Sequence, residues 1–304
     1  MIETPGDYCA APFILPDKAI TLLLPPMMKA GIFNDTSVSG HYGCTAVIGT
    51  LIAALAERNT EAAYLWPVAT DWQGHTAYLE AHRSNMIVVN GEGTIHHSAE
   101  RKRTRDLCAI ARYASDRQIP VHLVNASISD LEMTAIEAIS LFDTIHVRET
   151  ASQDYLNEYG IAATVVPDLS LGWPVAAANI SRKGVIVTDS VLKQTAGELR
   201  SFAEAMKAQY ESMRPRPSTA QRLKNSLAKR IKPSPAATHW HARSNVDGFI
   251  RRLKGCDLIV TGRFHSVMLA ILTDTPFVTL QSNTGKNEAV LKDCFGDTSR
   301  MITT

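Results

Sequence analysis

The chain has 304 residues, enough for one large domain or for two ordinary domains with their own hydrophobic cores. Hydrophobic residues make up 45% and charged residues 20%, which excludes a disordered, fibrous or collagen-like protein. The 31 Lys and Arg against 30 Asp and Glu give a net charge of +1, so no overall field draws the molecule to nucleic acid or to a membrane.

Short runs of Val, Ile and Leu alternate with longer amphipathic segments in the first half of the chain. This alternation is typical of βαβ units, in which helices join the strands of a parallel sheet. The predicted strands are residues 20–24, 62–66, 86–90, 121–125, 144–147 and 164–166. The predicted helices are residues 44–58, 99–116, 130–141 and 151–159.

The same alternation starts again after Leu171-Gly172-Trp173-Pro174 and a run of small residues. The predicted strands here are residues 184–188, 257–261 and 277–280, and the predicted helices are residues 196–210, 245–253, 263–272 and 286–295. We therefore predict an α/β protein with two Rossmann-like domains, residues 1–175 and 182–304, that face each other across a cleft.

The segment 212–243 interrupts the second domain. It contains four prolines and many Lys and Arg residues without any Asp or Glu, and residues 221–231 are a short helical candidate. Long excursions of this kind are functional lids or solvated loops, and both interpretations stay open. As a clamp for an anionic, lipid-linked substrate, the segment would gain ~1 kcal/mol for each basic residue near anionic lipid.

The chain contains five scattered cysteines: Cys9, Cys44, Cys108, Cys256 and Cys294. They form neither a C-x-x-C pair nor a Cys/His pattern at zinc spacing, and we interpret them as free thiols in a reducing compartment. The N-terminus does not have the pattern of a signal peptide, and the apolar stretch 46–56 is too short to span a bilayer. We expect a cytoplasmic protein with at most a peripheral contact at the inner face of the membrane through 212–243.

In open α/β sheets ligands bind beyond the carboxyl ends of the strands, so the residues after each predicted strand are the site candidates. After 86–90 comes a glycine-rich segment that allows close backbone approach to an anion, and its Glu92 can act as a general acid or base. A tight turn with an exposed glutamate is the plainer interpretation. His96 and His97 follow in this segment; being adjacent, they point in different directions and make poor joint metal ligands.

After the strand 257–261, Arg263 and His265 open a helix, whose free amides and positive dipole end suit a phosphate or a carboxylate. After 277–280, the side chains of Ser282, Asn283, Thr284 and Lys286 add donors for an anion. Neither segment is a Walker A loop or a G-x-G-x-x-G fingerprint, so those kinds of nucleotide site are not supported.

Two further places are candidates. Arg148 follows the strand 144–147 and Asp168 follows 164–166, where Arg148 could bind an anion or form a structural ion pair with a carboxylate. His41 opens the helix 44–58, where it could line the cleft or belong to a helix cap.

Together these segments resemble the polysaccharide pyruvyl transferase family. The resemblance is carried by residues 90–97, by Val147-Arg148-Glu149, by residues 166–170, by Gly262-Arg263-Phe264-His265 and by residues 282–286. The G-R-x-H element is the most specific, and the segments occur in order over most of the chain. Many members have a glycine-rich Asn-x-Gly-Asp turn near the start, from which residues 34–44 of this chain depart.

The resemblance implies a GT-B-like fold and a transferase that moves a pyruvyl group from phosphoenolpyruvate (PEP) onto two hydroxyls of one sugar, with release of phosphate. The acceptor would be a bacterial-type surface polysaccharide, such as a capsule or an exopolysaccharide of the cell envelope, or its lipid-linked or polymeric precursor. No cofactor, metal or nucleic acid is implied, and PEP is the co-substrate. The N-terminal domain would bind the acceptor and the C-terminal domain PEP.

Roles for individual residues follow from this reaction. The expected PEP ligands are Arg148, Arg263, His265, Ser282, Asn283 and Lys286. The expected acceptor ligands are His41, His96 and His97. In catalysis, His265 would protonate the PEP methylene, Arg263 would stabilise the charge, and Glu92 or Asp168 would deprotonate the attacking hydroxyl.

Two other functions are compatible with the sequence. A GT-B glycosyltransferase would hold the diphosphate of a nucleotide sugar at the same strand ends, since fold does not determine reaction. A non-catalytic carbohydrate-binding or assembly protein could share the fold, although the presence of Glu92, Arg263 and His265 disfavours it.

Overall fold

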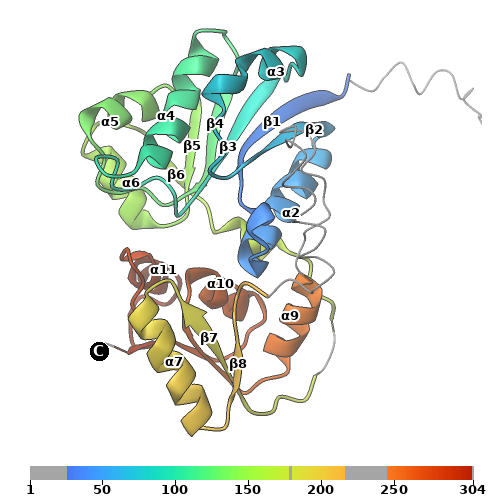
Figure 1. The fold of residues 1–304 in the computed structure, drawn as a ribbon, viewed down its shortest axis with the longest axis vertical. Coiled ribbons are helices and arrows are strands. Elements are labelled where there is room, and N and C mark those ends of the chain that lie inside the picture. Colours follow the sequence, from blue (N-terminus) through green and yellow to red (C-terminus); the bar gives the residue numbers. More distant parts are fainter. Residues whose placement is uncertain (1–25, 178–179, 216–244, 303–304) are drawn as a thin grey trace, which may run out of the picture.

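The computed structural model describes residues 26–177, 180–215 and 245–302, which form two α/β units, each built on one parallel sheet (Figure 1). The predicted strand 20–24, the helical candidate 221–231 and Cys9 lie outside the described residues, as does segment 212–243 beyond residue 215. Within the described residues, no helix is long and apolar enough to cross a membrane.

The first unit has a six-stranded sheet in the order β2-β1-β3-β4-β5-β6. The strands are β1 (Met28–Asp35), β2 (Thr60–Pro67), β3 (Met86–Glu92), β4 (Val121–Ala126), β5 (Thr144–Val147) and β6 (Thr164–Val165). The helices are α2 (Tyr42–Ala56), α3 (Thr76–Ala81), α4 (Lys102–Ser115), α5 (Met133–Ile139) and α6 (Thr150–Asn157). Short 3-10 helices are η1 (Ser37–Ser39), η2 (Gln73–His75) and η3 (Leu169–Gly172).

Strand β1 was absent from the sequence prediction, although it lies inside the sheet between β2 and β3. It carries Lys29 and Gly31 where a buried parallel strand would ordinarily continue its apolar run. The glycine is explained by packing: a Cβ at Gly31 would lie 2.2 Å from the ring of Tyr64 on β2. The other described strands of this unit confirm the predicted ones.

The second unit has a five-stranded sheet in the order β11-β10-β9-β7-β8. The strands are β7 (Val185–Ser190), β8 (Gln209–Glu211), β9 (Leu258–Gly262), β10 (Phe277–Leu280) and β11 (Met301–Ile302). The helices are α7 (Lys193–Ala205), α9 (Val246–Lys254), α10 (Phe264–Leu272) and α11 (Lys286–Phe295).

The predicted helix 196–210 is wrong at its end. Helix α7 stops at Ala205, and Lys207 has a left-handed backbone with φ 50°, which an α-helix cannot contain. The chain then turns and forms β8, the edge strand paired with β7. Tertiary pairing has overridden the amphipathic pattern there.

Helix α2 joins the two units (Figure 1). Its Leu51 packs in a cluster with Ile32 of the first sheet, whereas Tyr42 and Ala46 belong to the core of the second unit. The ring of Tyr42 stacks on Phe249 of α9 with centroids 4.3 Å apart. A helix that is apolar around most of its circumference is buried on more than one side, which accounts for the apolar composition of α2.

Candidate active site

The residues that follow the strands of both sheets meet at the junction of the units. After β3, a Cβ at Gly93 would lie 3.2 Å from Nζ of Lys286, which opens α11 after β10. After β9, His265 Nε2 lies 3.9 Å from Oδ2 of Asp168, which follows β6. The sequence-predicted candidates from four strand ends are thus brought together.

Three residues at this edge of the first sheet have a left-handed backbone. Near their carboxyl ends β1, β3 and β4 each contain a non-glycine residue with positive φ: Asn34 (62°), Glu92 (39°) and Asn125 (57°). Each such residue costs on the order of 1–3 kcal/mol and persists only where its surroundings hold it, which is common at functional sites.

Glu92 is held rigidly and is not the exposed turn residue of the plainer interpretation, since it is only 5% exposed. Its Oε1 accepts hydrogen bonds from Thr36 Oγ1 (2.5 Å) and Asn90 Nδ2 (3.2 Å). Its Oε2 accepts one from the Cys44 thiol at 3.4 Å, a weak donor. One carboxylate oxygen is therefore available for a proton from a ligand.

His265 lies in the first turn of α10 and is packed tightly against α2. A Cβ at Gly43 would lie 2.2 Å from His265 Cβ, so only glycine allows this approach. Burial lowers the pKa of His265 below the ordinary value, although the carboxylates of Asp168 and Glu92 oppose this effect. The ring is therefore neutral near pH 7 in the unliganded protein.

Arg148 and Asp168 form a buried ion pair at 2.8 Å, with side chains that are 1% and 0% exposed. Arg148 also donates to Ser127 Oγ and stacks over the ring of Phe264, with 4.1 Å from Cζ to the centroid. Asp168 accepts from both the backbone and the hydroxyl of Ser170. Both side chains are too buried to contact a substrate directly. The structure therefore argues against Asp168 as the base and against Arg148 as a direct PEP ligand.

Arg263 pairs with Asp189 at the end of β7 through Nε (2.9 Å) and Nη2 (3.2 Å). Its side chain is still 23% exposed. Asp189 also accepts hydrogen bonds from Ser212 Oγ and from the backbone of Met213, which fixes the start of the basic segment beside the site.

Lys286 lies near two other positively charged side chains, Arg148 and Arg263. Burial, followed by the positive charge of Arg148, lowers its pKa to about 8, against the opposing effect of Glu149; Arg263 also lowers it. Lys286 Nζ lies 3.5 Å from Asn283 Oδ1, which also accepts from Ser282 Oγ at 3.2 Å. Three of the four predicted donors after β10 are thus neighbours.

A cavity of about 490 Å³ lies beside this cluster, between the first unit and the start of α11. Lys286, Gly93 and His96 line it together with polar groups that the sequence analysis did not single out. Among these are Ser127, Ser129, Tyr155 and Glu158, and Glu149 of the Val147-Arg148-Glu149 motif also lines the cavity. Hydroxyl and carboxylate groups that line a cavity can hydrogen-bond to the hydroxyls of a sugar.

The two adjacent histidines differ in position, because His96 lines the cavity and His97 does not. Arg101, a donor only, contacts His96 Nε2, so the proton of His96 is on Nδ1 and is donated to His97 Nδ1 at 2.7 Å. Burial and the charge of Arg101 lower the pKa of His96 to about 4. His96 is therefore a neutral hydrogen-bonding group at the cavity.

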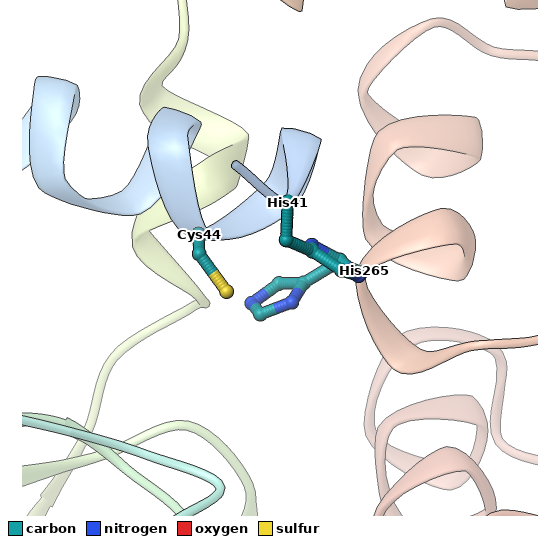
Figure 2. A group of neighbouring side chains, drawn as sticks. All are labelled: His41, Cys44 and His265. Atoms are coloured by element: carbon teal, nitrogen blue, oxygen red, sulfur yellow. The ribbon is translucent and has the colours of Figure 1, made fainter. Parts of the chain in front are cut away.

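His41, predicted as an acceptor ligand, is 6% exposed and faces His265, with ring centroids 5.5 Å apart (Figure 2). It is absent from the lining of the cavity. Cys44 lies one helical turn further along α2, and its sulfur is within 4.8 Å of a ring nitrogen of each of these two histidines. The spacing His41-x-x-Cys44 on one helix was the signal in the sequence that could have linked these two residues.

The sequence matches a family described as polysaccharide pyruvyl transferase over residues 41–284, which is most of the chain. No match is found among curated proteins.

Several solved structures share the fold. A UDP-GlcNAc 2-epimerase from Methanocaldococcus jannaschii, in complex with UDP-GlcNAc and UDP, has 15% identity and a TM-score of 0.56, with 91% of this chain and 89% of that chain covered. S. aureus MnaA with UDP has 15% identity and a TM-score of 0.54, with 87% and 82% covered. At this identity the likeness concerns the fold alone, and it confirms the predicted class of two Rossmann-like domains in a GT-B-like arrangement.

Proposed function

Since the chain belongs to the polysaccharide pyruvyl transferase family, we propose that it transfers a pyruvyl group from PEP to two hydroxyls of one sugar, with release of phosphate. The proposed acceptor is a bacterial-type surface polysaccharide or its lipid-linked precursor. The free thiols of Cys44, Cys108, Cys256 and Cys294 support a cytoplasmic location.

The observation that carries PEP as the donor is Lys286, which has no ion-pair partner among the described residues, whereas Arg148 is paired with Asp168 and Arg263 with Asp189. These cations are close enough for Arg148 and Arg263 to lower the pKa of Lys286. An anionic ligand beside Lys286 would favour its charged form and so offset this repulsion. PEP has a phosphate and a carboxylate, for which Lys286 and the exposed part of Arg263 are the proposed direct contacts, with Ser282 and Asn283 as neutral donors.

The first proposed step forms a bond from one sugar hydroxyl oxygen to C2 of PEP. His265 donates a proton to the methylene carbon, C3, and the C2 centre gains oxocarbenium character as the hydroxyl attacks it. Glu92 takes the proton of this hydroxyl. A dianionic phosphate beside the ring favours the imidazolium of His265, so the acid becomes charged when PEP binds.

The second proposed step breaks the bond between C2 and the phosphate oxygen. Glu92 returns its proton to the leaving phosphate, the second hydroxyl attacks C2, and neutral His265 takes the proton of this hydroxyl. Both groups are then restored. Asp168 is a positioning residue here, because it holds Arg148 and faces His265. No metal is required for this scheme, because Lys286 and Arg263 neutralise PEP.

The acceptor side is proposed to be the cavity beside Lys286. His96, Ser129 and Tyr155 line it and offer neutral hydrogen-bonding groups to hydroxyls. His41 and His97, which do not line this cavity, are less suited to contact the acceptor.

A thermal-shift titration with PEP, with UDP and CMP sugars in parallel, tests the donor. A ligand at 100 times its dissociation constant should stabilise the folded protein by roughly 2.7 kcal/mol. We expect a shift with PEP alone that is strongly reduced in Lys286→Met and unchanged in Lys292→Met, which removes an exposed lysine from the last turn of the same helix. A shift with nucleotide sugars alone would indicate a glycosyltransferase. Release of inorganic phosphate from PEP in the presence of sugar acceptors then tests turnover.

A further inference from the structure

His41, Cys44 and His265 form a group of metal-binding side chains at the junction of the units. His41 immediately precedes α2 and Cys44 lies in its first turn, whereas His265 lies in the first turn of α10. Their ligand atoms all lie within 4.8 Å of one another. Figure 2 shows the thiol and the His265 ring pointing toward each other, with the His41 ring beside them.

Two backbone features create this group. The i,i+3 spacing places His41 and Cys44 on one face of α2. Gly43, between them, lets α10 approach until His265 is nearly in contact with the α2 backbone, since a Cβ there would lie 2.2 Å from His265 Cβ. The third ligand is thus supplied by the other unit.

Each histidine ring in this group has a buried nitrogen without a hydrogen bond among the described residues. These atoms are His41 Nδ1 and His265 Nε2; for His265 Nε2, the carboxylate of Asp168 lies 3.9 Å away, beyond hydrogen-bond distance. An unsatisfied buried polar atom destabilises the folded protein, so a ligand that bonds to both nitrogens is favoured. Burial lowers the pKa of both histidines and raises that of the Cys44 thiol. The rings are neutral, and the thiol keeps its proton until a metal displaces it.

We propose that His41, Cys44 and His265 bind one Zn²⁺ ion, and that this ion inhibits the enzyme. Two imidazoles and one thiolate suit Zn²⁺, whereas Mg²⁺ and Ca²⁺ prefer oxygen ligands. Tetrahedral ligands of zinc are roughly 3.3–3.7 Å apart at its usual bond lengths. The three ligand atoms, all within 4.8 Å of one another, must move closer to that separation when the ion binds.

The charges around the group balance the ion. Arg263 and Lys286 oppose a cation, since both lower the pKa of His41. Two negative groups favour the cation. The Glu92 carboxylate lies 3.4 Å from the Cys44 sulfur, and together with the Cys44 thiolate it offsets the two positive charges of Zn²⁺.

Inhibition rests on the proposed function. A ring nitrogen of His265 that is bonded to zinc cannot carry the proton that C3 of PEP needs. A zinc ion also adds bulk and positive charge beside Glu92, and so opposes proton transfer to that carboxylate.

Cobalt titration of the full-length protein tests binding without PEP or acceptor. We expect one equivalent of Co²⁺ to give tetrahedral d–d bands and a thiolate charge-transfer band, displaced by Zn²⁺ and unaffected by Mg²⁺. Cys44→Ser, which keeps a donor to Glu92, should lose the charge-transfer band. Cys294→Ser, which removes an exposed thiol, should keep it. His41→Asn serves as a second variant with the thiol intact and should weaken cobalt binding by at least about tenfold.

Absence of the charge-transfer band, or its survival in Cys44→Ser, overturns the site. Inhibition is measured as phosphate release from PEP with added Zn²⁺. Wild-type turnover should fall and recover with a chelator, and Cys44→Ser, measured against its own turnover without zinc, should need at least about tenfold more Zn²⁺ for the same fractional inhibition. Equal inhibition of both proteins, or zinc binding without inhibition, overturns the inhibitory claim. If no acceptor supports turnover, the proposed function fails and the inhibitory claim with it, whereas the cobalt bands still decide the site.

Discussion

Lys286 changes its charge within the working pH range, because burial and then Arg148 lower its pKa to about 8. If its ammonium group binds PEP, protonated lysine below this pKa binds the anion and neutral lysine above it does not. We therefore expect a further fall of about tenfold per pH unit in kcat/KM for PEP above pH ~8, in addition to the decline that deprotonation of His265 causes at lower pH, because kcat/KM reports the free enzyme. Initial-rate kinetics across this range measure the profile.

Two variants assign this further fall to Lys286. Lys286→Arg keeps its charge at every pH of the experiment and should remove the fall. Lys286→Met should lower kcat/KM at all pH values below the inflection. If the fall persists unchanged in Lys286→Arg, another group is responsible.

The buried ion pair of Arg148 and Asp168 leads to a prediction on stability. Asp168→Asn leaves the guanidinium buried without its 2.8 Å partner, and removal of one member of such a pair costs about 3–5 kcal/mol. The free energy of unfolding in urea measures this loss. Arg112 and Glu137 form an exposed pair, 3.5 Å apart, and serve as the control. Glu137→Gln should change the free energy of unfolding by less than about 1 kcal/mol. Equal effects of the two substitutions would contradict the structural role of Asp168.

At the level of elements, the close approach of α10 to α2 depends on Gly43. Gly43→Ala adds a Cβ that would lie 2.2 Å from His265 Cβ, and no rotamer change moves a Cβ. Overpacking typically costs about 1–3 kcal/mol, against a gain of about 1 kcal/mol from helix propensity. We expect a lower melting temperature and a smaller thermal shift with PEP, both measured by thermal unfolding.

A matched control for this substitution lies in α7. A Cβ at Gly197 would meet nothing within 4 Å, so Gly197→Ala should raise the melting temperature through helix propensity alone. If Gly43→Ala is as stable as Gly197→Ala and binds PEP normally, α2 and α10 can move apart without a loss of stability or of PEP binding, which would contradict this prediction.

Elements with a strong local signal were predictable from the sequence. Strand β9 is a continuous apolar run and α10 an apolar helix after it, and both were predicted nearly to the residue. Strands β1 and β8 were not predicted, because they depend on contacts with distant residues. In β1, packing against the Tyr64 ring requires a glycine at position 31. Strand β8 forms by pairing with β7.

At the scale of the whole molecule, the site was predictable as a region and not as a set of contacts. Parallel sheets bring their strand ends together, so Glu92, His265 and Lys286 could be expected at one place. The pairing of Arg148 with Asp168 joins the ends of β5 and β6, which are neighbours in one sheet, whereas the meeting of His41 with His265 depends on how the two units pack. No periodicity in the sequence encodes that packing.

Because PEP held by groups of the second unit would lie next to Glu92 of the first, PEP should protect both units from hydrogen exchange. A ligand held by Lys286 and Arg263 next to Glu92 stabilises the folded form of every segment that it contacts. We expect slower exchange after β3, around Gly93, and in the first turns of α10 and α11, with one common dependence on PEP concentration. Amides of α4 away from the junction should not change. Protection of the second unit alone would place PEP in one domain and remove Glu92 from the proposed chemistry, since a base must reach the hydroxyl that attacks the bound PEP.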